Sequence, residues 1–154
     1  MNKYEYIFSS NIGNIRIEVD DDKIYLLTGT DKKISGSCPN GLAKKVEEEV
    51  SDYLDGKLEK FSIKTFYDKT PYVNKVVSEI AKIPYGQVIT YKDISDKIKS
   101  HPRAVGMACG KNPIPLIIPC HRVVGMSGKL TGFSMKGGVE VKKRLLDLEG
   151  IKLN

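Results

Sequence analysis

The sequence predicts a mixed α/β (α+β) protein with two domains. Residues 1–68 are expected to form a small domain of antiparallel sheet plus helix, and residues 69–154 a mainly helical domain that contains a helix-turn-helix. Apolar residues alternate with polar ones as far as Leu27, which is typical of strands, and later apolar residues mostly recur at helical spacing. Charge divides the chain similarly, because the first 70 residues hold 11 Lys and Arg against 13 Asp and Glu, whereas the rest hold 14 against 6.

The first domain is expected to begin with an antiparallel meander. Its strands cover residues 4–8, 15–19 and 24–27, with an acidic turn at residues 20–23 before the last of them. A helix then begins near Gly41, ends at Gly56 and carries one apolar stripe, formed by Leu42, Val46, Val50, Tyr53 and Leu54. A short strand is expected at residues 61–66, followed by a linker at residues 68–71.

The second domain opens with a helix that Thr70 caps and Pro71 begins. Its apolar face consists of Val73, Val76, Val77, Ile80 and Ile83, and the chain turns at residues 84–86. Thr90 and Asp93 then form a capping box at the start of a helix that runs through Ile98.

A short helix from Pro102 to about Lys111 completes the helix-turn-helix. Its surface is formed by small residues, namely Ala104, Gly106, Ala108 and Gly110. Since a glycine costs about 1 kcal/mol relative to alanine inside a helix, two of them indicate close approach of another backbone, from protein or DNA. Major-groove readers carry long polar side chains, which this helix lacks. Small residues and one arginine, Arg103, fit a minor groove with an inserted side chain better.

The rest of the chain is expected to hold a buried segment and a last helix. Residues 112–119 contain too much proline for a helix and are too apolar for a surface loop, so we expect an extended, buried segment that leads into Cys120. Gly137 and Gly138 precede the last helix, which ends at Glu149 with Gly150 as its stop. Its expected apolar positions are Val139, Val141, Leu145, Leu146 and Leu148.

Composition excludes several classes of protein. No apolar run of about 18 residues and no signal-peptide pattern occurs, so a cytoplasmic protein without a membrane partner is expected. Three scattered cysteines, Cys38, Cys109 and Cys120, predict no disulfide framework and no metal site. The net charge of +6 arises in the second half, which suits a polyanion such as nucleic acid, although a solvated lysine-rich surface is an alternative interpretation.

Cys120 is followed by His121 and Arg122 within an apolar stretch, which predicts a reactive thiol. Neighbouring cations favour the nucleophilic thiolate form of a cysteine. The alternative is a buried structural cysteine, which is common for a lone cysteine in an apolar run. Two successive basic residues are costly to bury without a purpose, so the reactive thiol is favoured.

Five ordered segments of the second half resemble the O6-alkylguanine-DNA alkyltransferases, also called methylated-DNA–protein-cysteine methyltransferases. They are Pro119 to Arg122, Gly86 to Tyr91, Arg103 to Gly106, Asn112 to Pro115, and Leu145 to Gly150. The first half is similar to the family only in kind. The resemblance implies DNA repair without a cofactor: Cys120 would take the alkyl group from O6 of guanine, and from O4-alkylthymine too, and would keep it permanently.

The resemblance also implies the catalytic residues. Glu149 would orient His121, which would draw the thiol proton of Cys120 through a water molecule. Since a carboxylate at a helix C-terminus meets an unfavourable dipole, we expect a cation such as protonated His121 to hold Glu149 charged. Tyr91 would donate a proton to guanine N3, and Asn112 would brace the active-site loop.

Substrate and DNA contacts are implied in the same way. The backbones of Val123 and Ser134 would contact the exocyclic amine and O6 of guanine, beside the aromatic wall of Phe133. Arg103 would replace the flipped nucleotide in the duplex, with Ala104, Gly106 and Tyr91 also at the DNA, in the minor groove. A monomer bound to double-stranded DNA with alkylated guanine is expected. Most family members carry tyrosine at the position of Phe133. We expect this difference to affect the range of alkyl groups that the site accepts and the rate of transfer.

Three other functions are compatible with parts of the sequence. A relative that binds alkylated DNA without repairing it would have tryptophan in place of Cys120. A helix-turn-helix regulator would need base-reading side chains and a dimerisation element, neither of which is found. A thiol hydrolase would turn over repeatedly and be indifferent to DNA.

Overall fold

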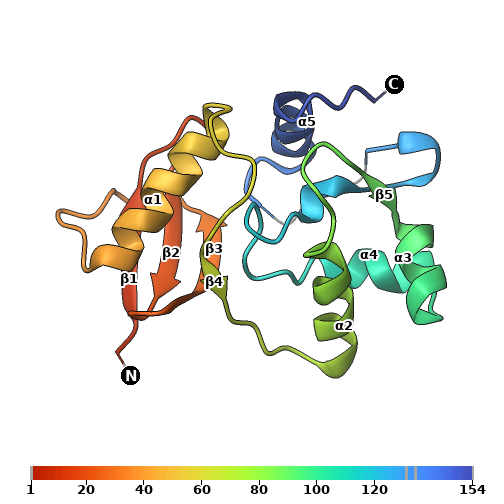
Figure 1. The fold of residues 1–154 in the computed structure, drawn as a ribbon, viewed down its shortest axis with the longest axis horizontal. Helices are drawn as coiled ribbons and strands as arrows, with labels where there is room; N and C mark the ends of the chain where they lie inside the picture. Colours follow the sequence, from red (N-terminus) through yellow and green to blue (C-terminus); the bar gives the residue numbers. More distant parts are fainter. Residues whose placement is uncertain (1, 131, 134, 154) are drawn as a thin grey trace. The chain divides into compact units, whose positions relative to one another are not determined.

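The computed structural model describes residues 2–130, 132–133 and 135–153. The chain divides into two compact units, residues 1–67 and 68–154 (Figure 1). The first consists of a sheet and one long helix, and the second of helices with a small two-stranded sheet. The predicted fold class is therefore confirmed.

The predicted meander in the first unit is confirmed. Strands β1 (Tyr4–Phe8), β2 (Ile15–Val19) and β3 (Lys23–Gly29) pair antiparallel in that order. The turn before β3 is held by Asp20, whose Oδ1 accepts hydrogen bonds from the backbone nitrogens of Asp22 and Lys23, at 2.7 and 2.8 Å. A short acidic sequence therefore fixes the turn through hydrogen bonds between side chain and backbone.

Helix α1 (Gly41–Leu54) follows the meander, with Oδ1 of Asn40 capping its first turn. Its buried face includes Val46, Val50 and Tyr53, as predicted, and it packs against β2. The predicted strand at 61–66 is reduced to β4 (Lys64–Thr65), which pairs parallel to β3. This pairing departs from the antiparallel expectation because the chain crosses over through α1 before it returns, and crossover connections produce parallel neighbours.

Three helices of the second unit pack together: α2 (Pro71–Ile80), α3 (Tyr91–Ile98) and α4 (Pro102–Cys109). Thr70 caps α2 through its hydroxyl, and both halves of the predicted capping box between Thr90 and Asp93 are formed. Helices α3 and α4 form the predicted helix-turn-helix.

A pair of short parallel strands connects the helix-turn-helix to the cysteine motif. Strand β5 (Ile89–Thr90) pairs with β6 (Val123–Val124), so that Ile89 lies opposite Val123. Since Tyr91 follows β5 directly and Cys120 precedes β6 by three residues, the pairing brings these two segments together. The sequence alone gave no sign of this pair.

Two expectations about the second unit are wrong. Residues 112–119 are buried as predicted but form turns, with the amide of Ile118 donating to the carbonyl of Ile114 at 2.9 Å and Leu116 at φ 75°. Helix α5 (Gly138–Leu148) buries Lys142 together with Leu145 and Leu146, while Val139 is exposed. Lys142 falls on the same face as these leucines because helix neighbours recur every three to four residues.

Within the described residues, no helix combines the length and apolar character required to span a bilayer.

Candidate active site

Cys120 lines a cavity of about 590 Å³ in the second unit. This volume falls within the range of roughly 300–1,000 Å³ typical of small-molecule sites. Helices α3 and α4 contribute Tyr91, Arg103 and Gly106 to its wall, and the segment after β6 contributes Met126 and Phe133. The thiol, the helix-turn-helix and the later loop therefore meet at one cavity.

Two backbone turns place Cys120 at this cavity. Cys120 begins a short 3-10 helix, η1 (Cys120–Arg122), and the residue is only 4% exposed. The preceding turn is braced by Asn112, whose Nδ2 donates to the carbonyl of Ile118 at 2.9 Å and whose Oδ1 accepts from the amide of Ile114 at 3.0 Å. A buried side chain that satisfies both backbone groups holds the turn in one conformation.

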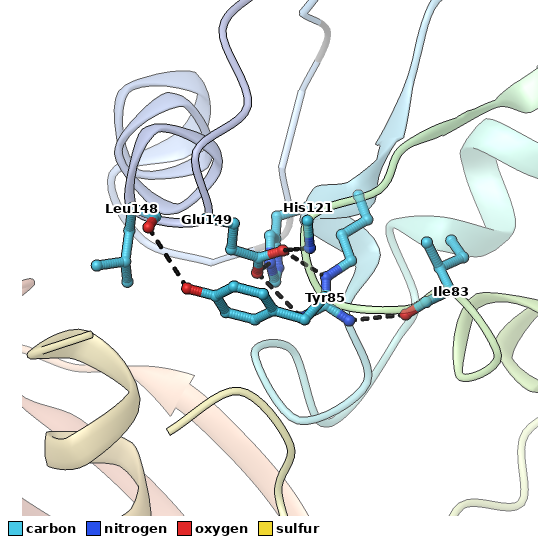
Figure 2. A network of polar contacts seen from close by, with 7 residues as sticks. Ile83, Tyr85, His121, Leu148 and Glu149 are labelled. Atoms are coloured by element: carbon cyan, nitrogen blue, oxygen red, sulfur yellow. Dashed lines mark hydrogen bonds and ion pairs between the residues drawn. The ribbon is translucent and has the colours of Figure 1, made fainter. Parts of the chain in front are cut away.

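Glu149, at the end of α5, is the centre of a buried polar network that includes His121, the residue after Cys120 (Figure 2). Its Oε2 lies 2.7 Å from Nε2 of His121. Arg122 donates to both carboxylate oxygens, from Nε to Oε1 at 2.9 Å and from Nη2 to Oε2 at 3.0 Å. Gly86, at φ 79°, directs its amide to Oε1 at 2.9 Å.

The protonation states follow from burial and these contacts. Burial raises the pKa of Glu149, but hydrogen bonds from His121, Arg122 and Gly86 outweigh it and lower the pKa to about 2. Burial lowers the pKa of His121 below its usual 6.5, although Glu149 acts in the opposite direction. An ionised carboxylate can only accept hydrogen bonds, so Nε2 of His121 carries the hydrogen. In a neutral ring Nδ1 is then the basic nitrogen.

His121 contacts Glu149 as expected, at 2.7 Å, but its lowered pKa disfavours the protonated form that the expectation named. Arg122 supplies the positive charge, in a two-pronged contact that suits a guanidinium and a carboxylate. Arg122 is itself fixed by a hydrogen bond from Nη1 to the carbonyl of Ile83 at 2.7 Å. His121 can consequently remain neutral and act as a base.

Lys142 is a site residue that the sequence reasoning missed. It is fully buried, and its Nζ donates to the carbonyl of Val123 at 2.6 Å and to the hydroxyl of Tyr91 at 3.4 Å. Burial lowers the pKa of Lys142, and the nearby sulfurs of Cys120 and Cys109 act in the opposite direction. A cation this close favours the thiolate form of Cys120. The signal in the sequence was a lysine on the face of α5 that carries Leu145 and Leu146.

A second thiol, that of Cys109, also lines the cavity from the end of α4. Burial and the neighbouring Cys120 raise the pKa of Cys109 to about 12. Since the thiolate is the nucleophilic form, the raised pKa disfavours reaction at Cys109.

Comparison with known proteins identifies the family. Residues 71–151 match the family described as 6-O-methylguanine DNA methyltransferase, DNA binding domain. The methylated-DNA–protein-cysteine methyltransferase of Saccharolobus islandicus strain L.S.2.15 is 38% identical over 151 residues, which cover 96% of this chain and 95% of that protein. The chain belongs to this methyltransferase family.

Solved structures of methyltransferases share the fold over nearly the whole chain. The O6-methylguanine methyltransferase of Mycobacterium tuberculosis is 32% identical, with a TM-score of 0.83 and coverage of 96% of this chain and 93% of that one. A structure of the same organism's OGT in complex with DNA has a TM-score of 0.82 at 32% identity, covering 94% of this chain and 91% of that one. The similarity therefore includes the first unit, for which the sequence offered only a general likeness.

The residues implied by the methyltransferase resemblance occupy three kinds of position. Cys120, Tyr91, Arg103, Gly106 and Phe133 line the cavity. Four others do not line the cavity: His121 and Glu149 form the buried pair, Asn112 braces the turn, and Val123 is fully buried, with its carbonyl bound by Lys142. Ala104 is half-buried on α4 away from the cavity lining, and Ser134 lies outside the described residues.

Proposed function

We propose that Cys120 is the residue that accepts an alkyl group from O6 of a guanine in DNA. As a member of its family, the protein repairs DNA by alkyl transfer to a cysteine. The observation that carries the assignment to Cys120 is its position at a cavity, with His121 as the next residue in the sequence. The ring of His121 lies edge-on to that of Phe133 in the cavity wall, with centroids 6.4 Å apart, and is held by Glu149 at 2.7 Å. A nucleophile, a base and a group that orients the base are the parts that activate a thiol.

The transfer forms one bond and breaks another. His121 takes the thiol proton at Nδ1 through a water molecule, and Sγ of Cys120 attacks the alkyl carbon. The bond from that carbon to O6 breaks, and its electron pair stays on the guanine, which receives a proton at N3 from the hydroxyl of Tyr91. His121 then returns its proton through solvent to the Tyr91 phenolate, so the net change is one proton moved from sulfur to guanine.

Lys142 supports both ends of this reaction. Its charge favours the Cys120 thiolate, and its contact at 3.4 Å with the hydroxyl of Tyr91 stabilises the phenolate that forms when Tyr91 gives up its proton. The product is a thioether, whose carbon–sulfur bond is stable to water. One protein molecule therefore accepts one alkyl group, from O6-alkylguanine and also from O4-alkylthymine.

Delivery of the base to the cavity requires that the nucleotide leaves the duplex, at a cost of a few kcal/mol. Arg103 lies at the cavity on the exposed side of α4, and Gly106 adds no side chain beside it. We assign α4 to the minor groove, with Arg103 in the space that the flipped nucleotide vacates. We assign a monomer as the acting form, because the proposed catalytic residues lie together in the second compact unit.

Intact-protein mass spectrometry tests the assignment. Incubation with duplex DNA that contains O6-methylguanine should add one methyl group per protein molecule, on the peptide that contains Cys120. The Cys120→Ala variant should bind the same duplex and leave the methyl group on the DNA. Methyl removal by this variant, or repeated turnover by the wild type, would overturn the proposal.

A further inference from the structure

Met126 is a large apolar side chain exposed at the mouth of the Cys120 cavity. It is 65% exposed and contributes to the cavity lining. Ile34, in the first unit, is 57% exposed and does not line the cavity. The two side chains are therefore both large, apolar and exposed, and they differ in position.

A closed turn presents Met126 at this position. The residue begins the short 3-10 helix η2 (Met126–Gly128), and the amide of Gly125 donates to the carbonyl of Lys129 at 2.7 Å across the turn. The amide of Gly128 also donates to the carbonyl of Gly125, at 3.1 Å. These bonds hold the backbone on both sides of Met126, so its exposure is built into the turn.

The surroundings of Met126 fit DNA. Lys92 and Arg103 line the same cavity from α3 and α4, and Lys129 closes the turn that carries Met126. An apolar side chain among cations at a cavity mouth is suited to a polyanion that also offers apolar faces, which are the stacked bases of a duplex. Proteins that bind the minor groove insert side chains such as methionine between base pairs and unstack them.

We propose that Met126 is a positioning residue that packs against the opened base stack beside the lesion and stabilises the nucleotide in its flipped state. This inference rests on the proposed function. Arg103 and Met126 then act from two different segments of the chain, one on α4 and one on the turn after β6. Arg103 supplies charge and hydrogen bonds, whereas Met126 supplies apolar contact without release of counterions.

The test compares Met126→Ala, Met126→Leu and Ile34→Ala in single-turnover methyl transfer. The substrates are a duplex with O6-methylguanine and free O6-methylguanine base. Loss of a partly buried methionine contact should slow Met126→Ala on the duplex by roughly fivefold to tenfold. The rate on the free base should change less than about twofold, Leu should restore the duplex rate, and Ile34→Ala should react like the wild type.

Two further measurements separate this role from a purely structural one. With 2-aminopurine beside the lesion, Met126→Ala should show a smaller rise in fluorescence on binding, because fewer nucleotides are flipped. The affinity of Met126→Ala for DNA should vary with salt concentration as that of the wild type does, since no phosphate contact is lost.

Equal losses on duplex and free base, or wild-type rates for Met126→Ala on both, would overturn the inference. A wild-type protein that fails to transfer the methyl group would instead overturn the proposed function.

Discussion

Arg122 binds both oxygens of the Glu149 carboxylate, 27 residues away in the sequence, at 2.9 and 3.0 Å. The side chain of Glu149 is fully buried, and that of Arg122 is 8% exposed. The pair fixes the end of α5 against the cysteine motif and holds Glu149 ionised, so that His121 can be oriented while it stays neutral. Arg122, which follows the proposed base His121 in the sequence, is thus part of the network that positions this base.

Replacement of Glu149 by Gln should destabilise the protein strongly. The change leaves the charge of Arg122 buried without its partner, and such losses amount to about 3–5 kcal/mol. The free energy of unfolding, measured by urea denaturation, checks this. Asp147→Asn is the matched control, because Asp147 is 50% exposed and pairs with Lys143 at the surface, where an ion pair contributes about 0–1 kcal/mol. Equal effects of the two variants would contradict the assigned role.

The stability of the protein should fall as pH drops below about 6.5. The folded-state pKa of His121 is lowered from 6.5. Below about pH 6.5 the unfolded chain therefore binds a proton at His121 more readily than the folded protein does, and this lowers the free energy of unfolding. Glu149, with a folded pKa of about 2 against 4.5, adds a second loss as pH falls below about 4.5. Denaturation between pH 7.5 and 5.5 isolates the first effect. His121→Gln should flatten the slope in this window, and an unchanged slope would refute the prediction. His101→Gln controls for the loss of a histidine.

Replacement of Lys142 by Met should slow methyl transfer by roughly 10- to 100-fold, because one preorganised charge at the reacting groups is removed. The variant keeps a long apolar stem in the buried position. Lys143→Met, at the next and exposed position, is the matched control for a lost charge. Single-turnover rates at saturating DNA separate the chemical step from binding. A loss confined to DNA affinity would argue against a role of Lys142 at the thiol.

Cys109 should remain unmodified when Cys120 reacts. Its pKa of about 12 leaves it protonated at neutral pH, although it lines the same cavity. In a variant with both Cys38→Ser and Cys120→Ser, Cys109 is the remaining cysteine. It should therefore not react with iodoacetamide at pH 7.5 while the protein is folded, and it should react when the protein is unfolded in urea. Mass spectrometry counts the adducts. Rapid labelling of the native variant would show that Cys109 is more accessible and more acidic than its burial indicates.

Local sequence determined much of this protein. The alternating strands before Leu27, the caps at Thr70 and Thr90 and the small-residue helix α4 were predicted because each depends on neighbours within a few residues. The motif around Cys120 pointed to the reactive thiol, and the family resemblance to His121 and Glu149. These features are encoded in short segments that can be interpreted in isolation.

Tertiary structure decided how these segments cooperate. The pairing of β5 with β6 and the contact of Arg122 with Glu149 join residues that are distant in sequence. Lys142 is buried on the face of α5 that carries leucines, although lysine is a polar residue. A lysine or arginine is ordinarily a surface residue. Its burial becomes favourable only when the fold places a carbonyl, a carboxylate or a thiol from another part of the chain beside it. The sequence therefore specified the reacting groups, and packing specified the charges that tune them.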